Sequence, residues 1–414
     1  MLDDHCKFTD DDERVSLYSY SKDIDACKRL GRPMPSFELA GPRRKIYFDP
    51  ATLNAGIVTC GGLCPGLNDV VRTIALGLQW QYEVKNVWGF KYGYEGMTAN
   101  PPAEPILLTE QVVDEIHLKG GDILASSRGP QNPDEMVDTL VRRDIRLLFV
   151  IGGDGTLRGA AALVETIKKR KLDIAVVGIP KTIDNDISGI ARSFGFSTAV
   201  AASRAAITGA HAEAKGAFNG IGLVKLMGRD SGFIAAYATL ANSDVNFCFV
   251  PEVPLVLEGP DGFLDILERR LAKKRHAVIV VAEGAGQNLI DQKCTQKDAS
   301  GNLLHADIGV FIRERIKQHF KTKGIPISMK YIDPSYIIRS VPADSSDSSF
   351  CLMLGQYAVH AGMTGRTNMV AGFWNQSFTH VPISVATLKR KKINPDGPLW
   401  QTVLTTTGQT RNQY

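Results

Sequence analysis

Short continuous apolar runs alternate with amphipathic stretches through the first half of the chain. The runs typical of strands lie at residues 55–59, 86–90, 147–151 and 173–179, and the stretches with helical periodicity lie at 68–79, 134–143 and 157–171. A strand that is apolar along its whole length is buried on both faces, as in a parallel sheet covered by helices. This alternation therefore predicts an α/β unit.

A second series of the same kind follows. Strands are expected at residues 221–226, 247–250 and 277–282, helices at 233–241, 262–274, 311–321 and 350–361, and a loop at 289–301. Ligands of such sheets bind at the carboxyl ends of the strands. We therefore predict the α/β fold class, with two doubly wound, mostly parallel α/β domains and the active site in the cleft between them.

Composition narrows the classes of protein that fit this pattern. Of the 414 residues, 44% are apolar and 22% are charged, which is typical of a globular protein with a sizeable core. The formal net charge is only +4 and the basic residues are scattered, so we expect no nucleic-acid partner. Residues 1–50 are polar and turn-rich, and we interpret them as an N-terminal extension that lies on the surface or is partly disordered.

The distribution of cysteines and apolar runs bears on the compartment. The seven cysteines are scattered, and only Cys60 and Cys64 lie close together, without a second pair at zinc-site spacing. We read all seven as free thiols in a reducing compartment. The acidic N-terminal residues have no apolar secretory core, and no run of eighteen apolar residues exists, so we expect no membrane association. A cytoplasmic protein is the expectation.

Two glycine-rich loops lie between predicted strands and helices. At residues 60–68 the glycines allow backbone N–H groups to approach an anion at a helix N-terminus, although many such turns are glycine-rich for steric reasons alone. The Gly-Gly-Asp-Gly-Thr sequence at 152–156 is neither a Walker A loop nor a Rossmann motif. Its Asp154 could cap the helix, but Thr156 is a second cap candidate, and an aspartate that holds Mg²⁺ against phosphates explains the composition better.

A third loop, residues 180–187, directly follows a predicted strand. Asp184 and Asp186 are two residues apart, so in an extended loop both carboxylates can point the same way. One can then act as a base while the other lies near a metal. An Asx turn is the structural alternative, but it does not account for Lys181 and Thr182 at the same strand end.

Three motifs in this order and spacing resemble the phosphofructokinase family: residues 152–156, 182–186 and the Met-Gly-Arg sequence at 227–229. The resemblance runs from about residue 56 to 372. The segments 60–66, 225–232 and 334–339 are similar to the ATP-dependent branch found in plants, kinetoplastids and some bacteria. The domains expected on this basis are an N-terminal extension (1–50), an ATP-binding α/β domain (51–196 plus about 347–395), a sugar-phosphate-binding α/β domain (197–346) and a C-terminal tail (396–414).

The resemblance implies a role for each matching residue. Contacts to ATP fall on Gly62, Arg128, Gly129, Gly153, Asp154, Gly155 and Thr156, and Mg²⁺ falls on Asp154 and Asp186. The catalytic residues implied are Asp184 as general base, Thr182 beside it, and Arg229, which stabilises the moving phosphoryl group. The residues implied to bind fructose 6-phosphate are Thr182, Ile183, Asp184, Met227, Gly228, Arg229, Glu283, Tyr336, Ile337, Ile338 and Arg339, with Tyr336 and Arg339 on the 6-phosphate.

The reaction implied is transfer of the ATP γ-phosphoryl group to the 1-hydroxyl of fructose 6-phosphate, in glycolysis, by a homo-oligomer that is a dimer or a tetramer. Gly155 favours ATP as donor, because family members that use pyrophosphate carry aspartate there. Lys181 points the other way, because lysine is usual in the pyrophosphate enzymes. A pyrophosphate-dependent phosphofructokinase is therefore the nearest alternative, and a non-catalytic sugar-phosphate-binding regulatory subunit is an alternative of another class. NAD and lipid kinases share the Gly-Gly-Asp-Gly-Thr loop but not the other motifs.

Two positions depart from the bacterial pattern. The arginine that reaches the 6-phosphate across a subunit interface in bacterial enzymes falls at Gly220, and a second phosphate arginine falls at Ser348. These departures leave effector control unreadable from the sequence. Ala125 stands where relatives often have glycine, and we expect its methyl group to be tolerated.

Overall fold

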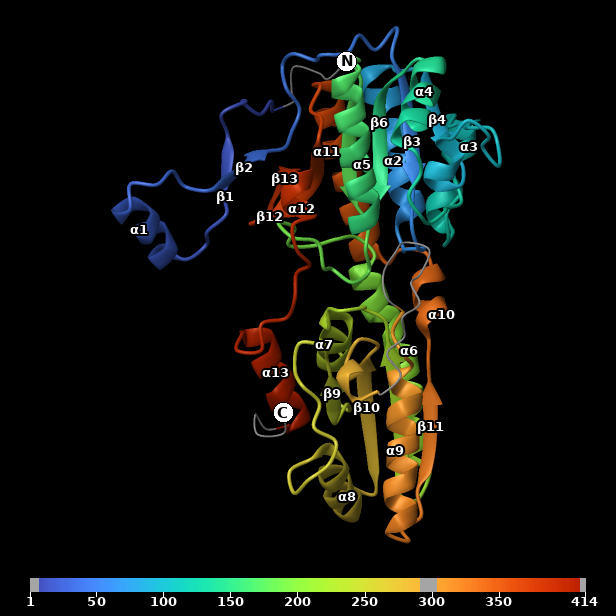
Figure 1. Cartoon of the computed structure of the whole chain (residues 1–414), viewed down its shortest axis with the longest axis vertical. Coiled ribbons are helices and arrows are strands. Elements are labelled where there is room, and N and C mark those ends of the chain that lie inside the picture. The colour runs from blue at the N-terminus through green and yellow to red at the C-terminus, as the bar shows by residue number, and fades with distance from the viewer. Residues whose placement is uncertain (1–6, 291–303, 410–414) are drawn as a thin grey trace. The chain divides into compact units, whose positions relative to one another are not determined.

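The computed structural model describes residues 7–290 and 304–409, which fall into two compact units (Figure 1). The first unit comprises Met1–Gly195 with Ser340–Arg390, and the second comprises Phe196–Arg339 with Lys391–Tyr414. Each unit contains one sheet with helices packed on it, which confirms the predicted α/β class with mostly parallel strands.

The sheet of the first unit has nine strands in the order β1-β2-β13-β12-β7-β6-β3-β4-β5. Their bounds are β1 (Arg14–Ser16), β2 (Ser36–Leu39), β3 (Asn54–Thr59), β4 (Asn86–Phe90), β5 (Ile106–Leu107), β6 (Ile145–Gly152), β7 (Ala175–Pro180), β12 (Met369–Trp374) and β13 (Ser377–Pro382). The central strands β4, β3, β6, β7 and β12 pair in parallel, and the outer strands pair antiparallel. Strands β3, β6 and β7 end side by side, so their carboxyl ends bring three loops to one edge.

Helices cover both faces of this sheet. The helices of this unit are α1 (Ser21–Arg29), α2 (Leu67–Tyr82), α3 (Glu110–Val113), α4 (Pro133–Arg142), α5 (Asp154–Lys169), α11 (Ser345–Met363) and α12 (Ile383–Ala386), with 3₁₀ turns η1 (Gly93–Met97) and η2 (Ile116–Leu118). Helix α1 buries none of its residues and does not take part in this covering. Side chains of α4, α5 and α12 share one apolar core with the strands. Helices α2 and α11 approach each other closely at Gly355 of α11. A Cβ on this glycine would lie 2.7 Å from the methyl carbon of Thr73 on α2.

Residues 7–50 contribute strands as well as loops. Strand β2 pairs with β13, and β1 pairs with β2, so this segment extends the sheet. On β2, Glu38 accepts hydrogen bonds from Arg366 at 2.8 Å and from Arg43 at 3.1 Å, and its other oxygen lies 3.0 Å from His380 Nδ1. Burial opposes the charge of Glu38, but its interactions with His380 and Arg366 lower its pKa to about 2. A cluster of charges therefore anchors the polar segment to the sheet.

The sheet of the second unit has four parallel strands in the order β11-β8-β10-β9. Their bounds are β8 (Gly220–Leu226), β9 (Phe247–Phe249), β10 (His276–Ala282) and β11 (Ser328–Ile332). The helices are α6 (Phe196–Lys215), α7 (Phe233–Leu240), α8 (Phe263–Lys274), α9 (Ile308–Thr322), α10 (Ser335–Ser340) and α13 (Pro398–Thr407), with a 3₁₀ turn η3 (Gln287–Leu289). Strands β8, β9 and β10 bury almost every side chain, as the continuous apolar runs predict.

Several expectations can be compared with these elements. The predicted strands and helices are confirmed with boundary shifts of up to five residues, whereas the twenty-residue helix α6 was not predicted. Helix α13 buries Trp400 within the segment interpreted as a C-terminal tail. The predicted loop at 289–301 lies mostly outside the described residues, as do Cys6 and Cys294. The other five cysteines are free thiols, as predicted, and no helix of the described residues is long and apolar enough to cross a membrane.

Candidate active site

Lys181 joins three of the predicted loops in the first unit. It directly follows β7, and its side chain is only 6% exposed. Its backbone N–H donates to the carbonyl oxygen of Gly152 at 2.9 Å, and its Nζ donates to that of Gly62 at 2.7 Å. Burial lowers the pKa of Lys181, which the nearby thiols and Asp122 and Asp184 oppose. The structure thus brings the loops after β3, β6 and β7 together.

The segment before Gly129 joins the same group of loops. Ser126 Oγ donates to Gly61 O at 2.7 Å, and the N–H of Gly61 donates to Ser127 O at 3.1 Å. Arg128 is exposed at the end of this segment, and Gly129 has a φ of 106° that favours glycine. Ala125 has a φ of 54°, so its backbone is left-handed. Glycine would adopt this conformation at less cost than alanine does.

The Gly-Gly-Asp-Gly-Thr loop forms the end of β6 and the first turn of α5. A Cβ at Gly152 would lie 2.3 Å from the side chain of Thr156, and one at Gly153 would lie 3.3 Å from Lys181 O. A Cβ at Gly155 would meet nothing within 4 Å. The fold therefore requires glycine at 152 but leaves open space at 155. Thr156 is nearly buried.

The loop at 182–186 is held by its own side chains. Thr182 Oγ1 accepts from the N–H of Asp184 at 3.0 Å and donates to Asp186 Oδ1 at 3.2 Å. Asn185, between the two carboxylates, has a left-handed φ of 52°. Ile183 is buried, with 6% of its surface exposed. The loop is therefore a compact turn rather than the extended segment expected, and that geometry needs a reversal at Asn185.

The charges of Asp154 and Asp186 affect each other. Burial raises the pKa of Asp186, Arg390 opposes this, and the charge of Asp154 raises it further. Asp154 pairs with Arg158 at 2.8 Å, and Asp186 Oδ2 lies 3.7 Å from Arg390 Nε. Carboxylate oxygens are the ligands that Mg²⁺ prefers. Two carboxylates that repel each other in a partly buried setting fit a divalent cation shared with phosphate groups.

Among the described residues, one other group has the spacing of a metal site: Asp265, Glu268 and His319 in the second unit. Glu268 there already bonds His319 at 2.9 Å and lies 3.5 Å from Lys323. Ion pairing accounts for this group.

In the second unit, Met227, Gly228 and Arg229 follow β8. Glu283, at the end of β10, uses its Oε1 to accept the backbone N–H of Gly228 at 3.3 Å and of Arg229 at 2.8 Å. Both backbones have positive φ, 137° at Gly228 and 48° at Arg229. Glu283 therefore shapes the Met-Gly-Arg turn, a role that the sequence did not suggest.

The segment at 336–339 lies on the short helix α10. Tyr336 is 74% and Ile337 71% exposed, whereas Ile338 is fully buried and packs in the interior. The guanidinium of Arg339 stacks over the ring of Tyr336 at 4.7 Å. Lys225 pairs with Asp333, just before this helix, and with Asp307, each at 2.9 Å. A contact from Ile338 to a ligand would have to come from its main chain.

Both departures from the bacterial pattern have a local structural use. A Cβ at Gly220 would lie 2.0 Å from Ala214 O, so no side chain fits there without a backbone change. Ser348 Oγ donates to Asp69 Oδ1 at 2.7 Å at the start of α11. Gly220 therefore has no room for an arginine in the present packing, and Ser348 is used in a bond to α2.

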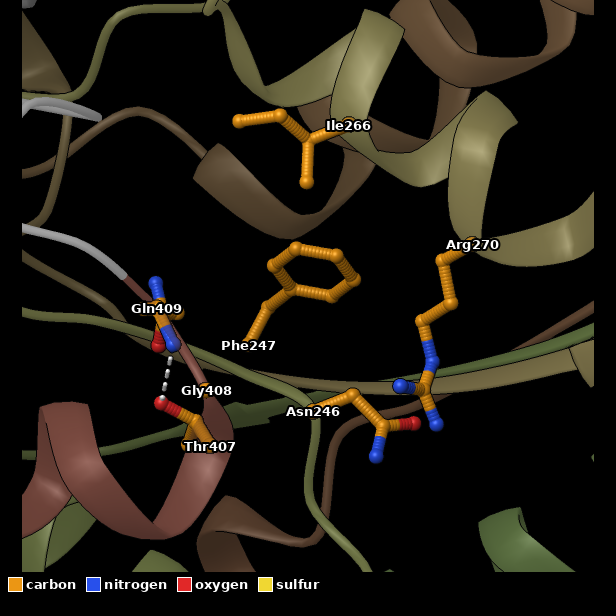
Figure 2. A pocket seen from close by; sticks show the side chains of 7 residues that line it. All are labelled: Asn246, Phe247, Ile266, Arg270, Thr407, Gly408 and Gln409. Atoms are coloured by element: carbon orange, nitrogen blue, oxygen red, sulfur yellow. Dashed lines mark hydrogen bonds between the residues drawn. The ribbon is translucent and has the colours of Figure 1, made fainter. Parts of the chain in front are cut away.

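A separate pocket of about 100 Å³ lies in the second unit, and Figure 2 shows its lining. It is formed by Asn246, Phe247, Ile266, Arg270, Thr407, Gly408 and Gln409. None of the predicted site residues lines it. Gln409 is buried there, and its Oε1 accepts a hydrogen bond from the N–H of Cys248 on β9 at 2.8 Å.

Glycine-rich loops and carboxylates at the carboxyl ends of parallel strands are typical of proteins that bind a phosphorylated ligand. A sequence model of the family described as phosphofructokinase matches residues 54–362. This chain belongs to the phosphofructokinase family, as the three motifs predicted.

Relatives with high identity extend over most of the chain. A protein of Borreliella burgdorferi named ATP-dependent 6-phosphofructokinase is 54% identical and covers 90% of this chain and 85% of its own length. One of Amycolatopsis methanolica with the same name is 51% identical and covers 91% of this chain and 83% of its own. ATP-dependent 6-phosphofructokinase 1 of Arabidopsis thaliana is 49% identical, with 90% and 79% covered.

The fold is also similar to solved structures. A pyrophosphate-dependent phosphofructokinase from Marinobacter aquaeolei matches with a TM-score of 0.70 at 17% identity, covering 86% of this chain and 91% of that one. Phosphofructokinase from Saccharomyces cerevisiae matches with a TM-score of 0.66 at 22% identity, covering 86% and 50%. At such low identity these structures support the fold alone.

Proposed function

We propose that the chain is a phosphotransferase that moves the γ-phosphoryl group of ATP to the 1-hydroxyl of fructose 6-phosphate, giving fructose 1,6-bisphosphate and ADP. Relatives that share 46–54% of their residues over about 90% of this chain are named for the ATP-dependent reaction. We further propose that the first unit binds ATP and the second binds the sugar phosphate. That both meet in one cleft stays a prediction from the sequence.

Gly155 is the observation that carries the choice of donor. The fold places no atom within 4 Å of the position where its Cβ would be, so steric demand does not explain the glycine. A ligand that passes close to the backbone does explain it. An aspartate here would bring a negative charge toward the phosphates of a nucleotide, where low dielectric strengthens the repulsion.

The chemistry requires a base, an electrophile held in line and cations on the transferring oxygens. The 1-hydroxyl oxygen forms a bond to the γ-phosphorus, the bond from that phosphorus to ADP breaks, and Asp184 takes the hydroxyl proton. Thr182 orients the loop through its bonds to Asp184 and Asp186. Arg229 neutralises charge on the moving group, while Tyr336 and Arg339 hold the 6-phosphate.

Asp154 and Asp186 would hold Mg²⁺. When bound, the ion supplies positive charge that shields the phosphates and stabilises the charge that develops during transfer. Arg158 pairs with Asp154 and Arg390 lies near Asp186, so these arginines offset part of the negative charge of the two carboxylates. The remaining proposed ATP contacts, Gly62, Arg128, Gly129, Gly153 and Thr156, lie on the loops joined by Lys181 or next to them.

A lysine at position 181 is the pattern of the pyrophosphate-dependent enzymes. The hydrogen bond that Lys181 makes in this fold supports ATP instead. Its Nζ holds Gly62 O inside the protein, so the cation already has a structural partner. A lysine that reads pyrophosphate would need to leave this bond. We propose that in this chain Lys181 positions the first glycine loop.

Initial rates with ATP and with pyrophosphate, each with Mg²⁺ and saturating fructose 6-phosphate, test the assignment. The wild type should work with ATP and show little activity with pyrophosphate, and Gly155→Asp should lose most of the ATP-dependent activity. Gly209→Asp is the matched control, since Gly209 is also a helical glycine with nothing within 4 Å. A wild type that prefers pyrophosphate contradicts the donor, and one that binds sugar phosphate without turnover is a regulatory subunit.

Assembly and location complete the proposal. We propose a homo-oligomer, a dimer or a tetramer, which ultracentrifugation of the purified chain can test. We keep a cytoplasmic location as a prediction, because the relatives include Arabidopsis enzymes named chloroplastic. Fluorescent tagging in the source cells decides between the two compartments.

A further inference from the structure

Ser193 lies outside the three motifs, yet it bonds two residues of the candidate catalytic loop, Thr182 and Asn185. Its Oγ donates to the carbonyl oxygen of Thr182 at 2.7 Å, and its N–H donates to Asn185 Oδ1 at 3.1 Å. Ser193 is 1% exposed and Asn185 8% exposed. One buried serine therefore holds the loop by hydrogen bonds to residues before and after Asp184.

The bond to Asn185 matters because of the backbone at that residue. Asn185 adopts a φ of 52°, a left-handed conformation that L-residues enter at a cost and that asparagine tolerates better than most. This turn sets the directions in which the side chains of Asp184 and Asp186 leave the chain. The N–H of Ser193 holds the Asn185 amide and thereby favours the turn.

Ser193 is itself held in place by its neighbour. Arg192 Nη2 donates to Asp347 Oδ1 at 3.0 Å and to Ser346 O at 2.9 Å, and Asp347 is fully buried. The guanidinium also stacks over the ring of Phe350 at 4.5 Å. Arg192 thus ties the chain beside Ser193 to the first turn of α11, a well-packed helix of the same unit.

We propose that Ser193, anchored through Arg192, is a positioning residue that keeps the base Asp184 and the metal-side carboxylate Asp186 in their reactive directions. The role rests on the proposed function, since it concerns that reaction. The serine touches no substrate in this scheme. Its effect passes through Thr182 and Asn185, so it should appear in kcat rather than in substrate affinity.

Ser193→Ala removes the hydroxyl and leaves the backbone N–H. We expect kcat to fall about tenfold, because small misplacement of a reacting group is costly, while both KM values change by less than about threefold. Ser203→Ala is the matched control: Ser203 is fully buried in α6, and its Oγ also makes a 2.7 Å bond to a backbone carbonyl oxygen, that of Ala199. It should lose similar thermal stability and keep its kcat.

Asn185→Gly gives a second, independent variant. Glycine accepts the left-handed backbone but lacks the amide, so kcat should fall in the same direction with little loss of Tm. The proposal is overturned if the kcat of Ser193→Ala equals that of Ser203→Ala. It is also overturned if Ser193→Ala and Asn185→Gly lose activity only in proportion to the fraction of folded protein. The wild-type rate with ATP tests the proposed function separately. If only pyrophosphate supports turnover, the donor assignment fails and the same kcat ratio is measured with pyrophosphate; if neither donor does, both proposals fail.

Discussion

The candidate catalytic loop of the first unit and the candidate sugar-phosphate segment of the second unit differ in how far the protein itself holds them. Lys181, Asn185 and Asp186 are each less than a tenth exposed. Lys181 and Asn185 bond to neighbouring segments, and Asp186 bonds to Thr182 within the loop. Tyr336 and Ile337 are more than two-thirds exposed on a helix of six residues. Proton transfer depends on the direction of the reacting groups and needs them pre-organised, whereas a phosphate group can be bound by a half-buried arginine on a largely exposed segment.

Removal of the proposed base, Asp184, tests the role of the candidate catalytic loop. Asp184→Asn keeps the shape of the side chain but cannot accept the proton, so kcat should fall by roughly 10² to 10⁴, with Tm and both KM values little changed. Steady-state rates measure this, and exposed Asp134→Asn on α4 serves as the control. A variant that retained more than a tenth of the wild-type kcat would exclude Asp184 as base.

The second side is tested at Arg339. Arg339→Ala should raise the KM for fructose 6-phosphate by an amount equivalent to about 1.5–3 kcal/mol and leave the KM for ATP near its wild-type value. Because Arg339 is only half-buried and stacks on the exposed ring of Tyr336, Tm should change little. The exposed Arg269→Ala on α8 is the control. An equal rise in both KM values would mean that Arg339 supports the fold.

The charge cluster around Glu38 allows a test of how much one half-buried carboxylate contributes to the stability of the first unit. The pKa of Glu38 is lowered from 4.5 to about 2, so its contribution is complete above pH 4.5 and is lost as the pH falls toward 2. At pH 7, Glu38→Gln should lower the free energy of unfolding by about 2 kcal/mol. Thermal melts from pH 7 to pH 2.5 should show the difference shrinking. Exposed Glu104→Gln should behave as wild type throughout, and a constant difference at all pH values would refute the role of the charge.

The smallest effect is expected beside the first glycine loop. Ala125→Gly relieves a left-handed backbone that costs an L-residue about 1–2 kcal/mol, and the greater freedom of the unfolded glycine chain offsets part of this. Denaturation in urea should show a gain of about 0.5 kcal/mol. Ala205→Gly, exposed within α6, should instead lose about 1 kcal/mol. A loss at both positions would mean that the methyl group of Ala125 makes a packing contact worth more than the strain.

How well the sequence predicted these regions depends on the kind of signal. Apolar runs predicted β6, β7, β8 and β10, because parallel strands must be buried on both faces. Helix α6 was missed because its run of alanine, serine and threonine has little apolar contrast between faces. The polar composition of residues 7–50 hid β1 and β2, whose pairing depends on β13, more than 330 residues away.

For the site, the motifs identified Gly155 and Asp184, but not the contacts that hold them. Ser193 could not be predicted, since an isolated serine eight residues from Asn185 carries no pattern of its own. The left-handed turn at Asn185 leaves a weak trace, because asparagine is frequent in that conformation. Glu283 is predicted to bind the sugar, which stays a prediction, whereas the bonds of its Oε1 to the Met-Gly-Arg turn follow from the structure alone.

The contact between Gln409 and β9 has a consequence for how the second sheet ends. Strand β9 lies at the edge of this sheet, and an edge with free backbone groups is a template for polymerisation with another chain. The Gln409 amide accepts the N–H of Cys248 at 2.8 Å and donates to its carbonyl oxygen at 3.5 Å, as a neighbouring strand would. A single side chain therefore occupies the backbone N–H and carbonyl oxygen of Cys248, the groups to which a further strand would bond at this position of the edge.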